Sequence, residues 1–190
     1  VFVIDNSGSM SDKILAVRNE VSAFAHSVVS SGIDARFGLV VFGGDSGSGL
    51  VELFQPMTPN VSELESALAA VPIGGGTEPA LDATLFALSA MGYRSCAQQF
   101  LVVVSDEPTN GDTVSMEDCI DAVNSTGAVV IAISPDLGEQ YTGPDARTLA
   151  ESTGGFWQDI ANADYSLILS ELAGYARSLW TLRYESTNTV

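Results

Sequence analysis

Residues with oxygen-bearing side chains gather in three short segments of the sequence. They are residues 5–9 (DNSGS), residues 74–78 (GGGTE) and residues 105–107 (SDE). In the first segment Ser7 and Ser9 lie on either side of a glycine, so an extended turn would point both hydroxyls at one ion. Carboxylate and hydroxyl oxygens are the ligands of hard cations such as Mg²⁺, Mn²⁺ and Ca²⁺. The candidate metal ligands are Asp5, Ser7, Ser9, Thr77 and Asp106.

Other kinds of chemistry are less well supported. Taken alone, residues 5–9 would also suit a helix N-cap and a turn. A phosphate-binding loop needs a lysine directly before its Ser or Thr, and the only lysine of the chain is Lys13. The only histidine, His26, lies within a predicted helix, which disfavours a Ser-His-Asp triad. Metal-assisted hydrolysis ranks only third among the possible functions, so we expect a binding protein and not an enzyme.

Two apolar patterns alternate along the chain and predict the elements that position these segments. Short β-branched runs predict strands, and apolar residues at steps of three and four predict helices. The expected strands are 1–4, 37–42, 50–54, 100–105, 128–134 and 156–159. The expected helices are 11–31, 61–71, 79–91, 115–124, 145–152 and 164–179, with Asn60 as the N-cap of the second.

The order of these elements predicts an α/β fold. The strands are continuous apolar runs, which is typical of a mostly parallel sheet covered by helices on both faces. Glycines between residues 43 and 49 predict a hairpin that adds one antiparallel edge strand. We therefore expect a doubly wound, six-stranded sheet. Ligands of such sheets bind outside the carboxyl ends of the strands, where all three polar segments would lie.

The pattern Asp5-x-Ser7-x-Ser9, with Thr77 and Asp106 at later strand ends, resembles the metal-ion-dependent adhesion site of von Willebrand factor A domains, also called integrin I domains. The resemblance covers essentially the whole chain in element order. It implies that these five residues hold Mg²⁺, or Ca²⁺ or Mn²⁺, and that the ion binds an Asp or Glu of a protein ligand. One departure is Glu107, because the family commonly has Gly after the last Asp.

The resemblance favours an adhesion module of a secreted or cell-surface protein. The alternative is an intracellular domain of the same fold in a chelatase or an ATPase-associated complex. We expect residues 1–184 to form the domain and residues 185–190 to begin a linker. Because the chain starts inside a predicted strand, we expect it to be part of a larger multidomain protein.

Composition limits the partners. The 190 residues include seven Lys and Arg against 24 Asp and Glu, a formal net charge of −17. Such a charge disfavours nucleic acid and anionic membranes, which bind basic surfaces. No apolar run is long enough to insert into a bilayer. Most of the acidic residues must form a solvated surface, which suits an extracellular or cell-surface setting. In that setting a disulfide between Cys96 and Cys119 is reasonable, and two buried free thiols are the alternative.

Overall fold

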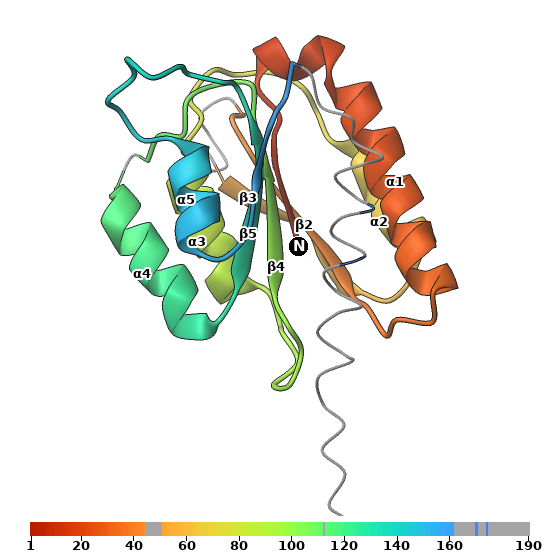
Figure 1. Ribbon diagram of the computed structural model, residues 1–190. Coiled ribbons are helices and arrows are strands. Elements are labelled where there is room, and N and C mark those ends of the chain that lie inside the picture. Colours follow the sequence, from red (N-terminus) through yellow and green to blue (C-terminus); the bar gives the residue numbers. More distant parts are fainter. Residues whose placement is uncertain (45–50, 112, 162–169, 171–173, 175–190) are drawn as a thin grey trace, which may run out of the picture.

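The computed structural model describes residues 1–44, 51–111, 113–161, 170 and 174. Strands and helices alternate along this part of the chain (Figure 1). The strands are β1 (Phe2–Asp5), β2 (Phe37–Phe42), β3 (Val51–Thr58), β4 (Phe100–Val104), β5 (Val129–Ser134) and β6 (Trp157–Asp159). The α-helices are α1 (Ile14–Ser30), α2 (Val61–Ala70), α3 (Ala80–Ala90), α4 (Met116–Thr126) and α5 (Ala146–Ser152), and a 3₁₀-helix, η1, spans Gly8–Asp12.

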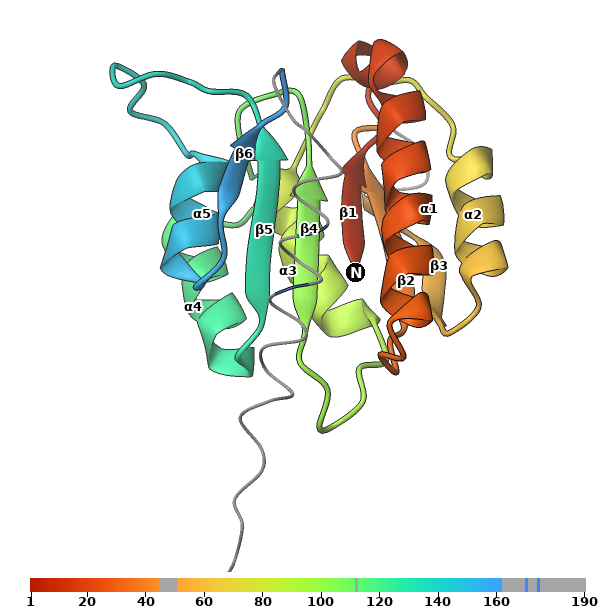
Figure 2. The same cartoon turned by 45° about the vertical axis from the view of Figure 1, so that its right-hand side comes forward.

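The strands of this region form one six-stranded sheet in the order β3-β2-β1-β4-β5-β6 (Figure 2). Every neighbouring pair is parallel except β2 and β3, which are antiparallel. The predicted doubly wound sheet with one antiparallel edge strand is therefore confirmed. The chain adds β2 on one side of β1 and β4 on the other, so the direction of winding reverses between β1 and β4. A ligand site in such a sheet is expected at this reversal.

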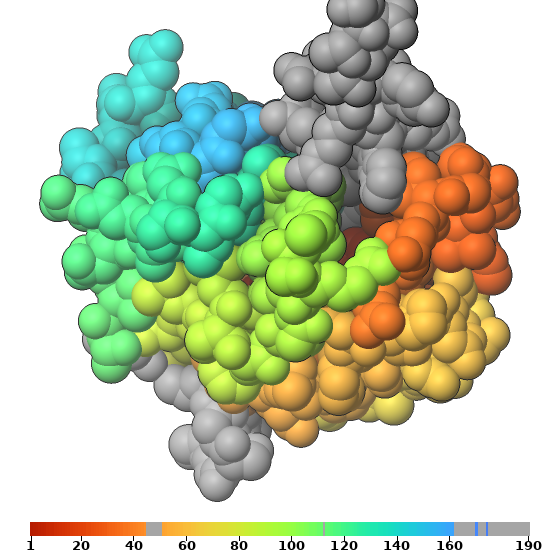
Figure 3. All heavy atoms as spheres, turned by 90° about the horizontal axis from the view of Figure 1, so that it is seen from below, coloured from red at the N-terminus to blue at the C-terminus, as the bar shows by residue number. Residues whose placement is uncertain are grey.

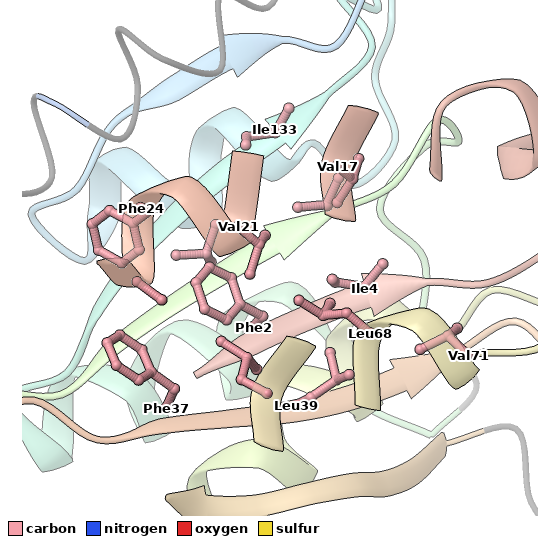
Figure 4. Close-up of a cluster of buried hydrophobic side chains, with 14 of the residues drawn as sticks. Phe2, Ile4, Val17, Val21, Phe24, Phe37, Leu39, Leu68, Val71 and Ile133 are labelled. Carbon is pink, nitrogen blue, oxygen red and sulfur yellow. The ribbon is translucent and has the colours of Figure 1, made fainter. Parts of the chain in front are cut away.

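Helices cover both faces of the sheet because its strands are apolar on both faces. In β1, Phe2 and Ile4 face one layer, which contains α1 and α2, and Val3 faces the other, which contains α3 and α4. Figure 4 shows the first layer, where Phe24 of α1 packs edge-on against the ring of Phe2 at a centroid distance of 6.0 Å. The buried face of α1 has the predicted spacing: Ile14, Val17, Val21, Phe24 and Val28.

The two edges of the sheet differ from its centre. The edge strand β3 is partly exposed, contains Pro56, and pairs with β2 through two register shifts. At the other edge, β6 has only three residues. The predicted third strand, 50–54, is too short at its carboxyl end: the strand continues to Thr58, because proline is tolerated in an edge strand.

Most other boundaries agree with prediction within a few residues. The first helix begins later than expected, at Ile14, because η1 occupies Gly8–Asp12. Asn60 caps α2 as predicted, since its side chain accepts a hydrogen bond from the Ser62 amide at 3.0 Å. The predicted helix 164–179 falls almost wholly outside the described residues, and the linker 185–190 lies entirely outside them. Within the described part, no helix has the length and apolar character needed to cross a membrane.

The expected Cys96–Cys119 disulfide is wrong. Cys96 is exposed in the segment before β4, whereas Cys119 is fully buried on α4, with its Sγ 3.9 Å from the Leu81 carbonyl oxygen of α3. The two thiols therefore occupy different environments. Burial, with a smaller contribution from the charge of Asp82, raises the pKa of Cys119 to about 12.

This difference predicts selective labelling of the native protein. A maleimide should modify Cys96 within minutes at neutral pH and leave Cys119 unmodified, because thiolate and access are both required for reaction. Mass spectrometry should find one label on the native chain and two in denaturant. The variant Cys96→Ser should carry no label when native. Rapid double labelling of the native chain would contradict the buried placement of Cys119.

A mostly apolar cavity of about 390 Å³ opens at the amino-terminal ends of the strands. Phe2, Phe24, Phe37 and Phe100 are among the residues that line it. Seen from below, the molecule is hollowed between the segments before β2 and before β4 (Figure 3). The cavity lies at the end of the sheet opposite to the polar segments, so it is not part of the candidate metal site.

Candidate metal centre

The two central strands place Asp5 beside the segment that follows β4. Ile4 of β1 is in register with Val104 of β4, so the next residues, Asp5 and Ser105, are neighbours at the carboxyl edge. Asp5 is completely buried. Its Oδ1 accepts a hydrogen bond from the Ser7 amide at 2.8 Å, and its Oδ2 accepts one from the Ser105 hydroxyl at 2.7 Å. The Asp5 carboxylate is therefore held on both oxygens.

A continuous chain of oxygen atoms extends from Ser7 to Asp106. The hydroxyls of Ser7 and Ser9 lie 2.9 Å apart, and the Ser9 hydroxyl donates to Oδ1 of Asp106 at 2.8 Å. Ser7 is fully buried and Ser9 is exposed, so the chain leads from the interior to the surface. Four of the five candidate ligands, Asp5, Ser7, Ser9 and Asp106, are thus brought together from β1, η1 and the end of β4.

The glycine-rich loop brings the fifth candidate to the same edge. Backbone hydrogen bonds join the loop to the first segment: the Gly8 amide donates to the Gly75 carbonyl at 3.2 Å, and the Gly74 amide donates to the Asn6 carbonyl at 2.9 Å. Thr77 follows in this loop with an exposed side chain. It is near the other four in the fold, but within the described residues its hydroxyl has no hydrogen bond to any of them.

Negative charges accumulate around the site. Burial raises the pKa of Asp5, and the charge of Asp106 raises it slightly more, against hydrogen bonds from Ser105 and Ser7 that lower it. Burial also raises the pKa of Glu78, as do the charges of Asp5, Glu107 and Asp106, while a hydrogen bond with Ser7 lowers it. These four acidic residues, Asp5, Glu78, Asp106 and Glu107, are called the acidic group below. Their ionised forms repel one another, and a bound cation would relieve that repulsion.

Three residues at this edge were missed by the sequence analysis. Ser105 orients Asp5. Lys13, the residue between η1 and α1, donates from Nζ to Oδ2 of Asp106 at 2.8 Å. Gly43, at the end of β2, passes so close to the first segment that a Cβ atom there would lie 2.7 Å from Oδ1 of Asp5. Gly43 belongs to a glycine-rich turn and Ser105 to one of the three polar segments, but neither signal predicts the contact with Asp5. The contacts of Lys13 and Ser105 join residues 93 and 100 positions apart.

The donor set fits a hard divalent cation. Within the described residues, no three His, Cys, Asp or Glu side chains are grouped as metal ligands. The candidate site instead combines two carboxylates with hydroxyls, a mixture that suits Mg²⁺, Mn²⁺ or Ca²⁺, which take oxygen ligands and retain water. His26 is not involved: it is exposed on α1, and its Nε2 lies 3.0 Å from Oε1 of Glu65 on α2.

Together, the doubly wound sheet and the oxygen-rich edge at its reversal point define an α/β domain with a candidate metal site. Comparison with known proteins names its family. The profile of the von Willebrand factor type A domain matches residues 1–168, and the chain belongs to this family. Domains of this family are generally protein-interaction modules. No curated protein shows significant sequence similarity to the chain.

Three solved structures with the same fold are similar to this chain. One is proximal thread matrix protein 1 from the mussel byssus, with a zinc-occupied MIDAS (metal-ion-dependent adhesion site) motif. It is 15% identical to this chain, with a TM-score of 0.67 over 92% of this chain and 44% of the mussel protein. This chain thus spans less than half of that protein. BatB from Bacteroides thetaiotaomicron is 16% identical, with a TM-score of 0.68 over 93% of this chain and 97% of BatB.

A third similar structure is the vWF domain of the type V pili tip protein Mfa5 from Porphyromonas gingivalis. It is 13% identical, with a TM-score of 0.69 over 99% of this chain and 97% of that domain. At these identities the likeness establishes the fold. The zinc-occupied MIDAS motif of the mussel protein is an example of divalent metal binding on this fold.

Proposed function

We propose that this domain binds a divalent cation through Asp5, Ser7, Ser9, Thr77 and Asp106 and uses the ion to hold a carboxylate of a protein ligand. The observation that carries the proposal is the oxygen chain at the carboxyl edge, in which Ser7, Ser9 and Asp106 are linked at 2.9 and 2.8 Å beside the buried Asp5. The family match to an interaction module supports the binding role over a catalytic one.

The physical role of the ion follows from the charges. Mg²⁺, the cation we favour, prefers about six oxygen ligands and usually keeps some waters. Two serine hydroxyls, the Thr77 hydroxyl and the two Asp residues, bound directly or through water, would leave a position for an incoming carboxylate. The ion neutralises carboxylates that otherwise repel and orders the segments that carry them. A partner Asp or Glu is attracted only when the ion offsets the acidic group.

We also propose that the domain works outside the cell or at its surface, within a larger protein. Two structural relatives have such settings in their names, a mussel byssus protein and a pilus tip protein. The net charge of −17 and the scarcity of lysine fit this setting, since they keep the surface solvated. Cys96 and Cys119 are both free, so no disulfide supports this setting.

The ligand position can be tested with Mn²⁺ and a small carboxylate. Protein-bound Mn²⁺ should increase the relaxation rate of water protons, and a blocked Gly-Asp-Gly peptide should lower that rate as it displaces water from the ion. The effect should appear at roughly 1–10 mM peptide, because a single contact of this kind gives millimolar affinity.

The matched peptide Gly-Asn-Gly should leave the relaxation rate unchanged, because it lacks the carboxylate. A solution of Mn²⁺ and peptide without protein corrects for direct association of the two. If Mn²⁺ binds but the two peptides behave alike, the ion has no position for a ligand carboxylate, and the proposed function is wrong.

A further inference from the structure

Lys13 makes a contact with Asp106 that the proposed metal site does not require. Its Nζ lies 2.8 Å from Oδ2 of Asp106, while the other oxygen, Oδ1, accepts from Ser9. The Asp106 side chain is only 8% exposed and that of Lys13 is 37% exposed. The carboxylate is thus fixed at both oxygens, with Oδ1 directed toward the serines and Oδ2 toward the lysine.

The charge balance makes this contact unusual. Lys13 is the only lysine of the chain. Among the ion pairs in the described ranges, the Lys13–Asp106 pair is the one that includes a member of the acidic group. The other pairs join Glu65, Asp34 and Asp136 to basic side chains elsewhere. In the described part of the chain, Lys13 is therefore the positive charge paired with the acidic group.

We propose that Lys13 is the built-in counter-ion of this site: it stabilises the metal-free arrangement of Asp106, and its positive charge limits how tightly the divalent ion binds. The limit on metal affinity rests on the proposed function, whereas the stabilisation of Asp106 by Lys13 does not. Lys13 is a positioning residue, because it contacts Oδ2 of Asp106, a proposed metal ligand, and leaves Oδ1 of Asp106 facing the serines.

The two effects of Lys13 on metal binding have opposite signs. Holding Asp106 in place favours binding, whereas a positive charge close to a doubly charged ion opposes it. Fixing one side chain contributes a factor of a few in affinity. Repulsion between a unit charge and a divalent ion a few ångströms away contributes about tenfold even when water screens it. Repulsion dominates, so removing the charge should tighten metal binding.

Titration calorimetry with Mg²⁺ tests this sign. Lys13→Gln should lower the dissociation constant for Mg²⁺ by about tenfold at low ionic strength, and less at high salt. Lys13→Arg, which keeps the charge, should stay within about twofold of the wild type. Arg36→Gln is the matched control: it removes one charge from an exposed residue before β2, at the far end of the sheet, and should not change the affinity. Unchanged or weaker binding by Lys13→Gln would overturn the proposed charge effect.

A second measurement examines the counter-ion in the absence of metal. With chelator present, Lys13→Gln should lower the melting temperature by about 2 °C, the amount expected for a half-exposed ion pair. In an Asp106→Asn background the same substitution should have no effect. Equal losses in both backgrounds would overturn the counter-ion role. If neither the wild type nor Lys13→Gln bound Mg²⁺, the proposed function would fail, and so would the proposed effect of Lys13 on metal affinity. The melting temperatures measured with chelator would still test whether Lys13 stabilises Asp106.

Discussion

Asp5→Asn is expected to abolish the stabilisation of the domain by Mg²⁺. For the wild type, Mg²⁺ at about 100 times its dissociation constant should add about 2.7 kcal/mol to the free energy of unfolding. For a chain of this size that corresponds to a rise in melting temperature of roughly 5–10 °C. The variant should show no rise, because Asp5 is the fully buried carboxylate beside the oxygen chain of Ser7, Ser9 and Asp106.

The substitution should not harm the metal-free fold. Burial raises the pKa of Asp5, so the folded state disfavours its ionised form, and the neutral amide removes that cost. The asparagine oxygen can still accept from the Ser7 amide, and its nitrogen can donate to the Ser105 hydroxyl. Differential scanning fluorimetry with chelator and with Mg²⁺ gives both values. Asp12→Asn, an exposed position in η1, is the control of equal charge and should keep the full rise.

A metal-dependent rise that persists in Asp5→Asn would place the ion elsewhere. Loss of the rise together with a large loss of metal-free stability would show instead that Asp5 is needed for the fold. The two results are separable because each is read from its own melting curve.

Gly43→Ala is expected to damage both the fold and the metal site. Gly43 has a φ of +108°, which side chains rarely adopt, and an added Cβ would lie 2.7 Å from Oδ1 of Asp5 and 3.0 Å from the Ser7 nitrogen. The backbone strain costs about 1–2 kcal/mol. The forced shift of a packed neighbour adds about 1–3 kcal/mol. The free energy of unfolding should fall by about 2–5 kcal/mol, and the affinity for Mg²⁺ by more than about tenfold.

The adjacent Gly44→Ala provides the matched control. Among the described residues, a Cβ atom there would meet only Nδ2 of Asn6, at 3.8 Å, which is an ordinary contact. Urea denaturation and calorimetry should find this variant close to the wild type. Similar losses in both variants would mean that the loop, and not the approach of Gly43 to Asp5, determines the effect.

Much of the fold was predictable because its signals are local. Apolar runs and helical spacing depend on residues a few positions apart, and they identified all six described strands and all five described α-helices. The errors came where tertiary context overrides local preference. Pro56 suggests the end of a strand, yet an outer strand accepts it. The late start of α1 reflects η1, where the chain turns to bring Ser9 toward Asp106.

The site was predictable in its residue types but not in its contacts. Side chains at the carboxyl ends of parallel strands must share one edge, which is why Asp5 and Asp106 were expected to be neighbours. The side chains that support them are fixed by approaches between distant segments. Lys13 meets Asp106 across 93 residues, and Ser105 meets Asp5 across 100. Nothing in the local sequence distinguishes Lys13 from any solvated lysine.

The outer strands bear on how such a domain associates with other proteins. An outer strand with free amide and carbonyl groups can accept a strand from another chain and begin a fibre. Here Pro56 removes one donor from β3 and its register shifts make pairing irregular, while β6 offers only three residues. Strand addition is disfavoured on both sides of the described sheet. A domain built in this way can be present at high local density without polymerising through its backbone.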